Sequence, residues 1–172
     1  MDFQVETKKA RYKMRATMQT ARLYRSIFLS DLIKDLTLDS EELDAEKITK
    51  IMYVHVLCRD ESIQEYEAWT ATLPAIPLSD VITAIQTVWT AITMPTVDIP
   101  ADTGESEGRV RDTDLGYSNI LYIGKKLKLS LFEMDVLTPG EILDMLYTEV
   151  KMQEEQKNPV YLATQDDYEN FF

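Results

Sequence analysis

The sequence predicts an α+β fold that is predominantly α-helical: a short N-terminal β-hairpin packed on a helical domain, then a linker and a small helical C-terminal domain. Three observations predict it. Apolar residues alternate with polar ones near the N-terminus, they recur at spacings of three and four over most of the remaining chain, and a stretch rich in proline and glycine separates two helical regions. Hydrophobic residues make up 45% of the 172 residues, which is enough for a core in one domain or two small ones.

The hairpin is predicted over residues 2–6 and 11–16. In both segments apolar side chains occupy every second position, which places them on one face of a strand. The connecting residues 7–10 lack the Asn-Gly or Asp-Gly pair that is typical of tight hairpin turns.

The first helices follow from the change to a helical period. One amphipathic helix is predicted from about residue 17 to residue 36, because apolar side chains recur every four residues at Tyr24, Phe28, Leu32 and Leu36. A second helix over residues 43–59 has little polar face, so we expect it in the middle of the domain.

Two further helices carry signals at their ends. Ser62 and Glu65 fit a capping box, in which each side chain bonds the other residue's backbone N–H, and prolines end that helix at 74 and 77. The next helix begins at Ser79 or Asp80. Its apolar residues are spaced three, four and three, so they share one face: Ile82, Ile85, Trp89 and Ile92.

The proline- and glycine-rich stretch predicts a flexible linker over residues 94–116, between an N-terminal domain (1–93) and a small helical domain (117–157). An acidic, aromatic tail over 158–172 follows. Within the small domain we expect a helix over 117–127 and then two capping boxes: Ser130 with Glu133, and Thr138 with Glu141. The last helix has an apolar face composed of Ile142, Leu143, Leu146 and Val150.

The charge is large and unevenly distributed. There are 18 Lys and Arg against 30 Asp and Glu, and the net charge of -12 argues against general nucleic-acid binding. Residues 1–27 carry +5, which leaves -17 for the remaining 145 residues. This split favours self-association or docking to an acidic partner; the alternative is that the cations form a solvated face of the hairpin and first helix.

Candidate chemistry is sparse. His55 and Cys58 lie three residues apart on one helix face, where they are either core side chains or a nucleophile pair. One His and one Cys are too few for the usual zinc clusters. Carboxylate pairs such as Asp31 and Asp35 are expected at the surface, and no phosphate-binding or nucleophile-elbow motif occurs. We therefore predict no catalytic, cofactor-binding or metal-binding residues.

Location follows from the absence of two further signals. The most apolar runs are shorter than the ~18–20 residues that a membrane-spanning helix needs. The N-terminus lacks the pattern of a secretory signal. We expect a protein of the cytoplasm with no membrane partner.

Three stretches resemble the tail assembly chaperones of long-tailed phages and prophages, especially those of Gram-positive hosts. They are the basic hairpin and helix ending SDLIKDL (30–36), the helix at 48–57 followed by SIQEYEAW (62–69), and LKLSLFEMDVLTPGEILDML (127–146). The third resembles the family pattern most, although Lys128 stands where the pattern has a small residue, commonly glycine.

The resemblance implies a protein that is not an enzyme, that works in the host cytoplasm and that is absent from the mature particle. Such chaperones bind the tape-measure protein, shield its long apolar helices and recruit the major tail tube protein, and the charge split adds an expectation of self-association. In lambda-like phages a longer form, made by frameshifting, adds the C-terminal domain. The alternative is an acidic regulatory or anti-defence protein that binds a host factor.

The residues expected to bind partners fall in three groups. The C-terminal helices are expected to contact the tube protein through Leu131, Phe132, Met134, Leu137, Ile142 and Leu146. The tail carries four aromatic anchors, Tyr161, Tyr168, Phe171 and Phe172. The basic hairpin carries Arg11, Lys13 and Arg15.

Overall fold

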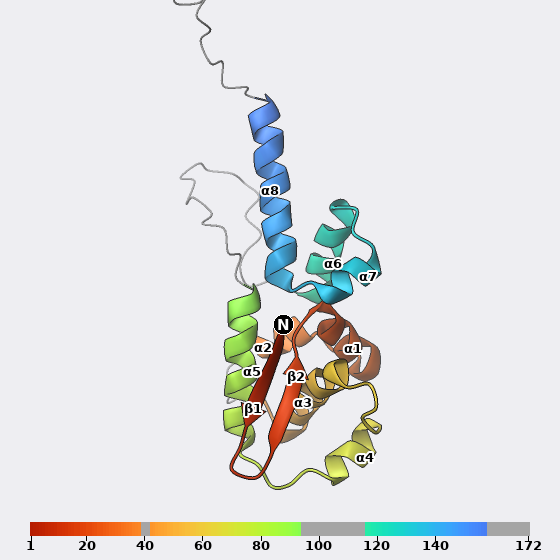
Figure 1. Cartoon of the computed structure of the whole chain (residues 1–172), viewed down its shortest axis with the longest axis vertical. Coiled ribbons are helices and arrows are strands. Elements are labelled where there is room, and N and C mark those ends of the chain that lie inside the picture. Colours follow the sequence, from red (N-terminus) through yellow and green to blue (C-terminus); the bar gives the residue numbers. More distant parts are fainter. Residues whose placement is uncertain (39–41, 94–115, 158–172) are drawn as a thin grey trace, which may run out of the picture.

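The computed structural model describes residues 1–38, 42–93 and 116–157. It confirms a predominantly helical α+β fold with a two-stranded antiparallel hairpin at the N-terminus (Figure 1). In chain order the elements are β1 (Asp2–Glu6), β2 (Arg11–Arg15), α1 (Met18–Phe28), α2 (Leu32–Leu36), α3 (Ala45–Arg59), α4 (Tyr66–Ala71), α5 (Leu78–Thr93), α6 (Tyr117–Lys126), α7 (Leu131–Val136) and α8 (Pro139–Lys157).

The turn of the hairpin contains no glycine and is held by hydrogen bonds between Thr7 and Ala10. The Thr7 N–H donates to the Ala10 carbonyl at 2.8 Å, and the Thr7 hydroxyl accepts from the Ala10 N–H at 3.0 Å. The register pairs Phe3 with Met14, and the inward side chain of Met14 is fully buried. The predicted alternation is therefore confirmed, and its apolar face packs on α3.

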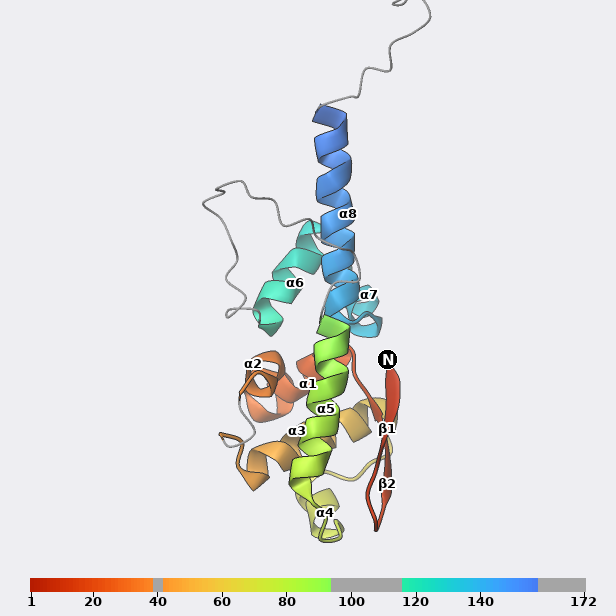
Figure 2. The ribbon, with the colours of Figure 1, turned by 90° about the vertical axis from the view of Figure 1, so that its left-hand side faces the viewer.

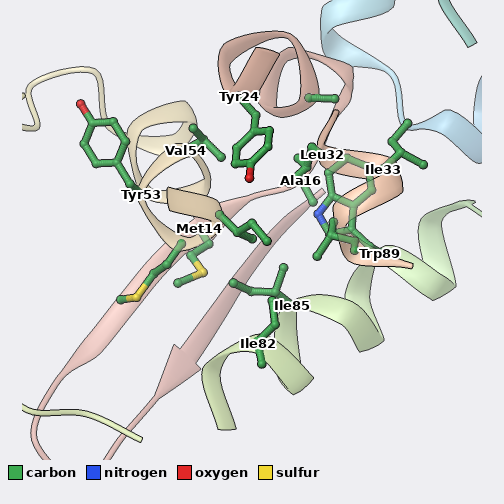
Figure 3. Packing of buried hydrophobic residues seen from close by; sticks show 14 of the residues in the cluster. Met14, Ala16, Tyr24, Leu32, Ile33, Tyr53, Val54, Ile82, Ile85 and Trp89 are labelled. Carbon is green, nitrogen blue, oxygen red and sulfur yellow. The ribbon is translucent and has the colours of Figure 1, made fainter. Parts of the chain in front are cut away.

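Helix α3 occupies the centre of the N-terminal region, as predicted. It contacts β2, α1, α5 and α4. Figure 3 shows Met14 of β2, Tyr24 of α1, and Ile85 and Trp89 of α5 converging beside this helix. All four are at most 2% exposed, so the core forms where the hairpin and three helices meet.

The single helix predicted over 17–36 is wrong: the chain breaks into α1 and α2. Leu29 ends α1 in the left-handed conformation, with φ of 56°, and its N–H donates to the Arg25 carbonyl. Asp31 then begins α2, accepting from the Ile33 N–H at 3.2 Å. A cap with a strong local acceptor outweighs the continuous apolar period.

The box predicted at Ser62 is also wrong. The Ser62 hydroxyl donates to the Asp60 carboxylate at 2.6 Å, and helix α4 begins four residues later at Tyr66, with Glu65 at its N-cap. Both boxes in the C-terminal region are confirmed: the Glu133 carboxylate accepts from the Ser130 N–H, and that of Glu141 from the Thr138 N–H.

The C-terminal helices pack directly on the N-terminal region. Helix α7 contacts α1, and the base of α8 contacts α5. Tyr117 and Ile120 of α6 and Ile142 of α8 join the same buried cluster as the hairpin and α3. Figures 1 and 2 both show α8 extending from this junction along the long axis of the molecule. The boundary between domains 1–93 and 117–157 stays a prediction, and residues 94–115 of the predicted linker lie outside the described residues.

Candidate partner-binding surfaces

Helix α7 presents three large apolar side chains to solvent. Leu131 is 54% exposed, Phe132 79% and Val136 63%. Phe132 and Val136 are one turn apart and therefore share a face. We call these three residues the α7 ridge. Two of them, Leu131 and Phe132, are among the residues predicted to bind a partner.

Helix α7, which carries the ridge, is held in place by hydrogen bonds at both ends and by an ion pair. At its N-terminus the Ser130 hydroxyl accepts from the Glu133 N–H at 3.2 Å, and hydrogen bonds from Ser130 lower the pKa of the Glu133 carboxyl. At the other end the Leu137 carbonyl accepts from the Met18 N–H at 2.9 Å. Arg22 of α1 also forms a two-pronged ion pair with Asp135, with N–O distances of 2.8 and 2.5 Å.

The remaining predicted residues of the C-terminal helices lie deeper. Met134 and Ile142 are 2% and 0% exposed, so they belong to the core and offer no surface to a partner in this conformation. Leu137 and Leu146 are half-buried. The outer part of α8 instead exposes three apolar side chains that the prediction did not include: Met145, Val150 and Met152.

The basic hairpin residues lie at the surface, although two are paired. Arg11 contacts Glu6 at 2.8 Å and Arg15 contacts Asp2 at 2.7 Å, while Lys13 is exposed. The four aromatic anchors of the tail, Tyr161, Tyr168, Phe171 and Phe172, lie outside the described residues.

A second surface, which the sequence reasoning missed, is an open groove of about 600 Å³ between α1, α3 and α4. We call it the aromatic groove. Rings of Phe28, Tyr53 and Tyr66 pack edge to face in it, with centroids 5.0 to 6.3 Å apart. Its full lining is Ile27, Phe28, Glu46, Lys50, Tyr53, Glu65, Tyr66 and Glu67.

The aromatic groove is negatively charged at its rim. Lys50 pairs with Glu46 at 2.6 Å and lies over the Phe28 ring, 5.5 Å from its centroid. Within the part of the chain that the structure describes, Glu65 and Glu67 pair with no cation. Burial, and then these two carboxylates, raise the pKa of Tyr53. The alternation of acid and aromatic in residues 65–67 is the sequence signal that could have pointed to this surface.

A smaller cavity of about 200 Å³ shares Phe28, Glu46 and Lys50 with the aromatic groove. Close beside it, the Asp35 carboxylate accepts hydrogen bonds from the hydroxyls of Tyr24 and Ser30, both at 2.8 Å, and is 8% exposed. The expectation that Asp35 is a surface charge is therefore wrong. This network joins α1 to α2 across the break at Leu29.

His55 and Cys58 are core side chains. The His55 Nδ1 bonds the Ile51 carbonyl at 2.6 Å, and its Nε2 accepts from the Trp89 Nε1–H at 2.5 Å, so both ring nitrogens are engaged. Burial lowers the pKa of His55 to about 4 and raises the pKa of the Cys58 thiol. Cys58 donates to the Gln19 side-chain oxygen at 3.6 Å, and both His55 ring nitrogens bond other groups, so the two residues do not form a nucleophile pair.

No family model, curated protein or solved structure matches the chain. The two surfaces are therefore interpreted from their own geometry. Among the described helices, none has the length and apolar character to cross a membrane. Residues 1–38, 42–93 and 116–157 contain no group of three or more His, Cys, Asp or Glu side chains placed to hold a metal ion.

Proposed function

We propose that this protein is a tail assembly chaperone of a long-tailed phage or prophage, working in the host cytoplasm. It binds the tape-measure protein, recruits the major tail tube protein, associates with further copies of itself, and is absent from the mature virion. The proposal does not require a bond to be made or broken, because the function is to cover and present apolar surface.

The α7 ridge is the observation that carries the proposal. It lies within the segment 127–146, which resembles the family pattern most, and it exposes apolar side chains on a capped helix. Exposed apolar side chains that are grouped together mark sites of association. The buried side chains beneath it, such as Met134, hold the helix in place.

The backbone at Lys128 also supports the proposal. The family pattern has a small residue, commonly glycine, at this position. Lys128 adopts a φ of 60°, in the left-handed region that glycine populates most easily. The sequence pattern and the backbone geometry therefore agree on where the turn between α6 and α7 lies.

Co-expression with the tape-measure and tube proteins encoded beside this gene tests the proposal. The tagged chaperone should recover at least one of them. The double variant F132S/V136S should lose the tube protein, because it removes the apolar face of the α7 ridge. L29S is the matched control, since Leu29 is 90% exposed and lies outside α7.

Failure to recover either tail protein with folded chaperone present would contradict the proposal. Recovery of a single host protein at equal stoichiometry, with neither tail protein, would favour the acidic regulatory protein instead.

A further inference from the structure

The aromatic groove combines partly exposed aromatic rings with a rigid, buried ring beneath them, as a binding site does. Phe28 and Tyr66 are half-buried, so part of each ring faces solvent, while Tyr53 beneath them is 5% exposed and fixed by its hydroxyl, which donates to the Gln64 carbonyl at 3.2 Å. A volume of about 600 Å³ lies in the range of sites that hold a small ligand or a few peptide side chains.

The charges around the three aromatic rings determine which kind of partner the groove favours. Glu46, Glu65 and Glu67 line the groove against the single cation Lys50, which Glu46 already neutralises. Glu65 and Glu67 therefore remain available to a partner; both are exposed, and they flank the half-buried Tyr66 in the sequence. Aromatic faces attract cations, and a flanking carboxylate adds direct charge pairing.

We propose that the aromatic groove binds a basic, apolar peptide segment of a partner protein, in which a large apolar side chain enters between Phe28 and Tyr66 while neighbouring Arg or Lys side chains pair with Glu65 and Glu67. The basic hairpin of a second copy is a poorer occupant. Its exposed tip carries Lys8 and Lys9 without a large apolar side chain, and Phe3 and Tyr12 already pack on the core.

This inference does not depend on the chaperone proposal, and its test uses no tail protein. The probe is a short fluorescein-labelled peptide with leucines on one helical face and arginines on the other. Fluorescence anisotropy measures its binding to the full chain. Two matched peptides, one with every arginine replaced by glutamine and one with every leucine replaced by serine, should each bind at least about tenfold more weakly.

The variant E65Q/E67Q should weaken binding of the basic peptide by about tenfold at low salt. Added salt should reduce this difference in affinity between the wild type and the variant, because it screens the charge pairs. Both glutamates are exposed, so this variant should keep the fold. Y66A should weaken binding by about thirtyfold, in keeping with loss of a central aromatic anchor. Trp69, whose ring lies 5.3 Å from that of Tyr53, should change its emission on binding in the wild type.

Two controls separate this surface from the others. E149Q removes a carboxylate from α8, and F132S/V136S removes the α7 ridge; both should bind the basic peptide as the wild type does. The inference is overturned if E65Q/E67Q and a folded Y66A bind the peptide as tightly as the wild type, or if the glutamine-substituted peptide binds as tightly as the basic one.

Discussion

Helices α3 and α8 are both long and both rich in apolar residues, yet they lie in opposite environments. Helix α3 buries eight side chains and has neighbours on several sides. Among the described side chains of α8, Ile142 is the one large apolar group that is fully buried, while Met145, Val150 and Met152 are exposed. Apolar composition alone therefore does not decide burial in this protein; the number of neighbouring elements does.

The largest expected difference comes from deleting one apolar side chain in each helix. Ile51 of α3 is 0% exposed, so I51A should lower the free energy of unfolding by about 4 kcal/mol through lost burial and a residual cavity. Val150 of α8 is 44% exposed, and V150A should cost less than about 0.5 kcal/mol. Urea denaturation measures both, and similar costs for the two variants would contradict the sparse packing of α8.

Acid should lower the free energy of unfolding through a residue of α3. His55 has an ordinary pKa of 6.5 and a folded-state pKa of about 4, so the unfolded chain binds its proton first as the pH falls. The stability supplied by neutral His55 is fully present above pH 6.5 and is lost as the pH falls toward 4. This contribution is on the order of 3 kcal/mol.

The measurement is the free energy of unfolding against pH, followed for the wild type and H55L. The variant should be less stable at neutral pH, because the Trp89 Nε1–H loses its acceptor, but its curve should be flatter between pH 6.5 and 4. An equally steep curve for H55L would assign the acid sensitivity to other groups.

The C-terminal region should gain stability at its strained turn. Lys128 has a φ of 60° and is exposed, so K128G should raise the free energy of unfolding by about 1 kcal/mol. The matched control K125G, inside α6, should lower it by about 1 kcal/mol. Thermal unfolding distinguishes the two, and a loss of stability in K128G would mean that its side chain stabilises the turn.

The smallest change in the free energy of unfolding is expected for a substitution in the hairpin, at Tyr12. The Tyr12 hydroxyl is buried, and within the described residues it has no hydrogen-bond partner. Y12F should therefore change the free energy of unfolding by less than about 0.5 kcal/mol. Y24F is the control, because its hydroxyl bonds Asp35 at 2.8 Å and its loss should cost about 1.5 kcal/mol. Equal costs in chemical denaturation would reveal a partner for Tyr12.

What could be predicted from the sequence was mostly local. The boxes at Ser130 and Thr138 formed because each is followed directly by a helix, and the hydroxyl in each donates to the glutamate of its own box. At Ser62 the same pattern failed because Asp60, two residues earlier, takes the serine hydroxyl. The hairpin and the buried character of α3 followed from period and composition.

Features that depend on distant residues could not be predicted. Asp35 has the sequence surroundings of a surface carboxylate, and its burial depends on donors that lie outside α2, among them the hydroxyl of Tyr24 from α1. The aromatic groove likewise arises from how α4 lies against α1 and α3. Phe28 was assigned to an apolar helix face, but no local pattern places Tyr66 beside it.

Asp31 has a consequence for how the chain is assembled during synthesis. Its carboxylate caps α2 and also accepts from the Tyr117 N–H at 3.1 and 3.2 Å, and a side chain at Gly116 would collide with it. The ribosome makes residue 31 long before residue 117, and nascent chains fold from the N-terminus. The Asp31 carboxylate is therefore synthesised before α6 and can accept the Tyr117 N–H as soon as the first turn of that helix is made.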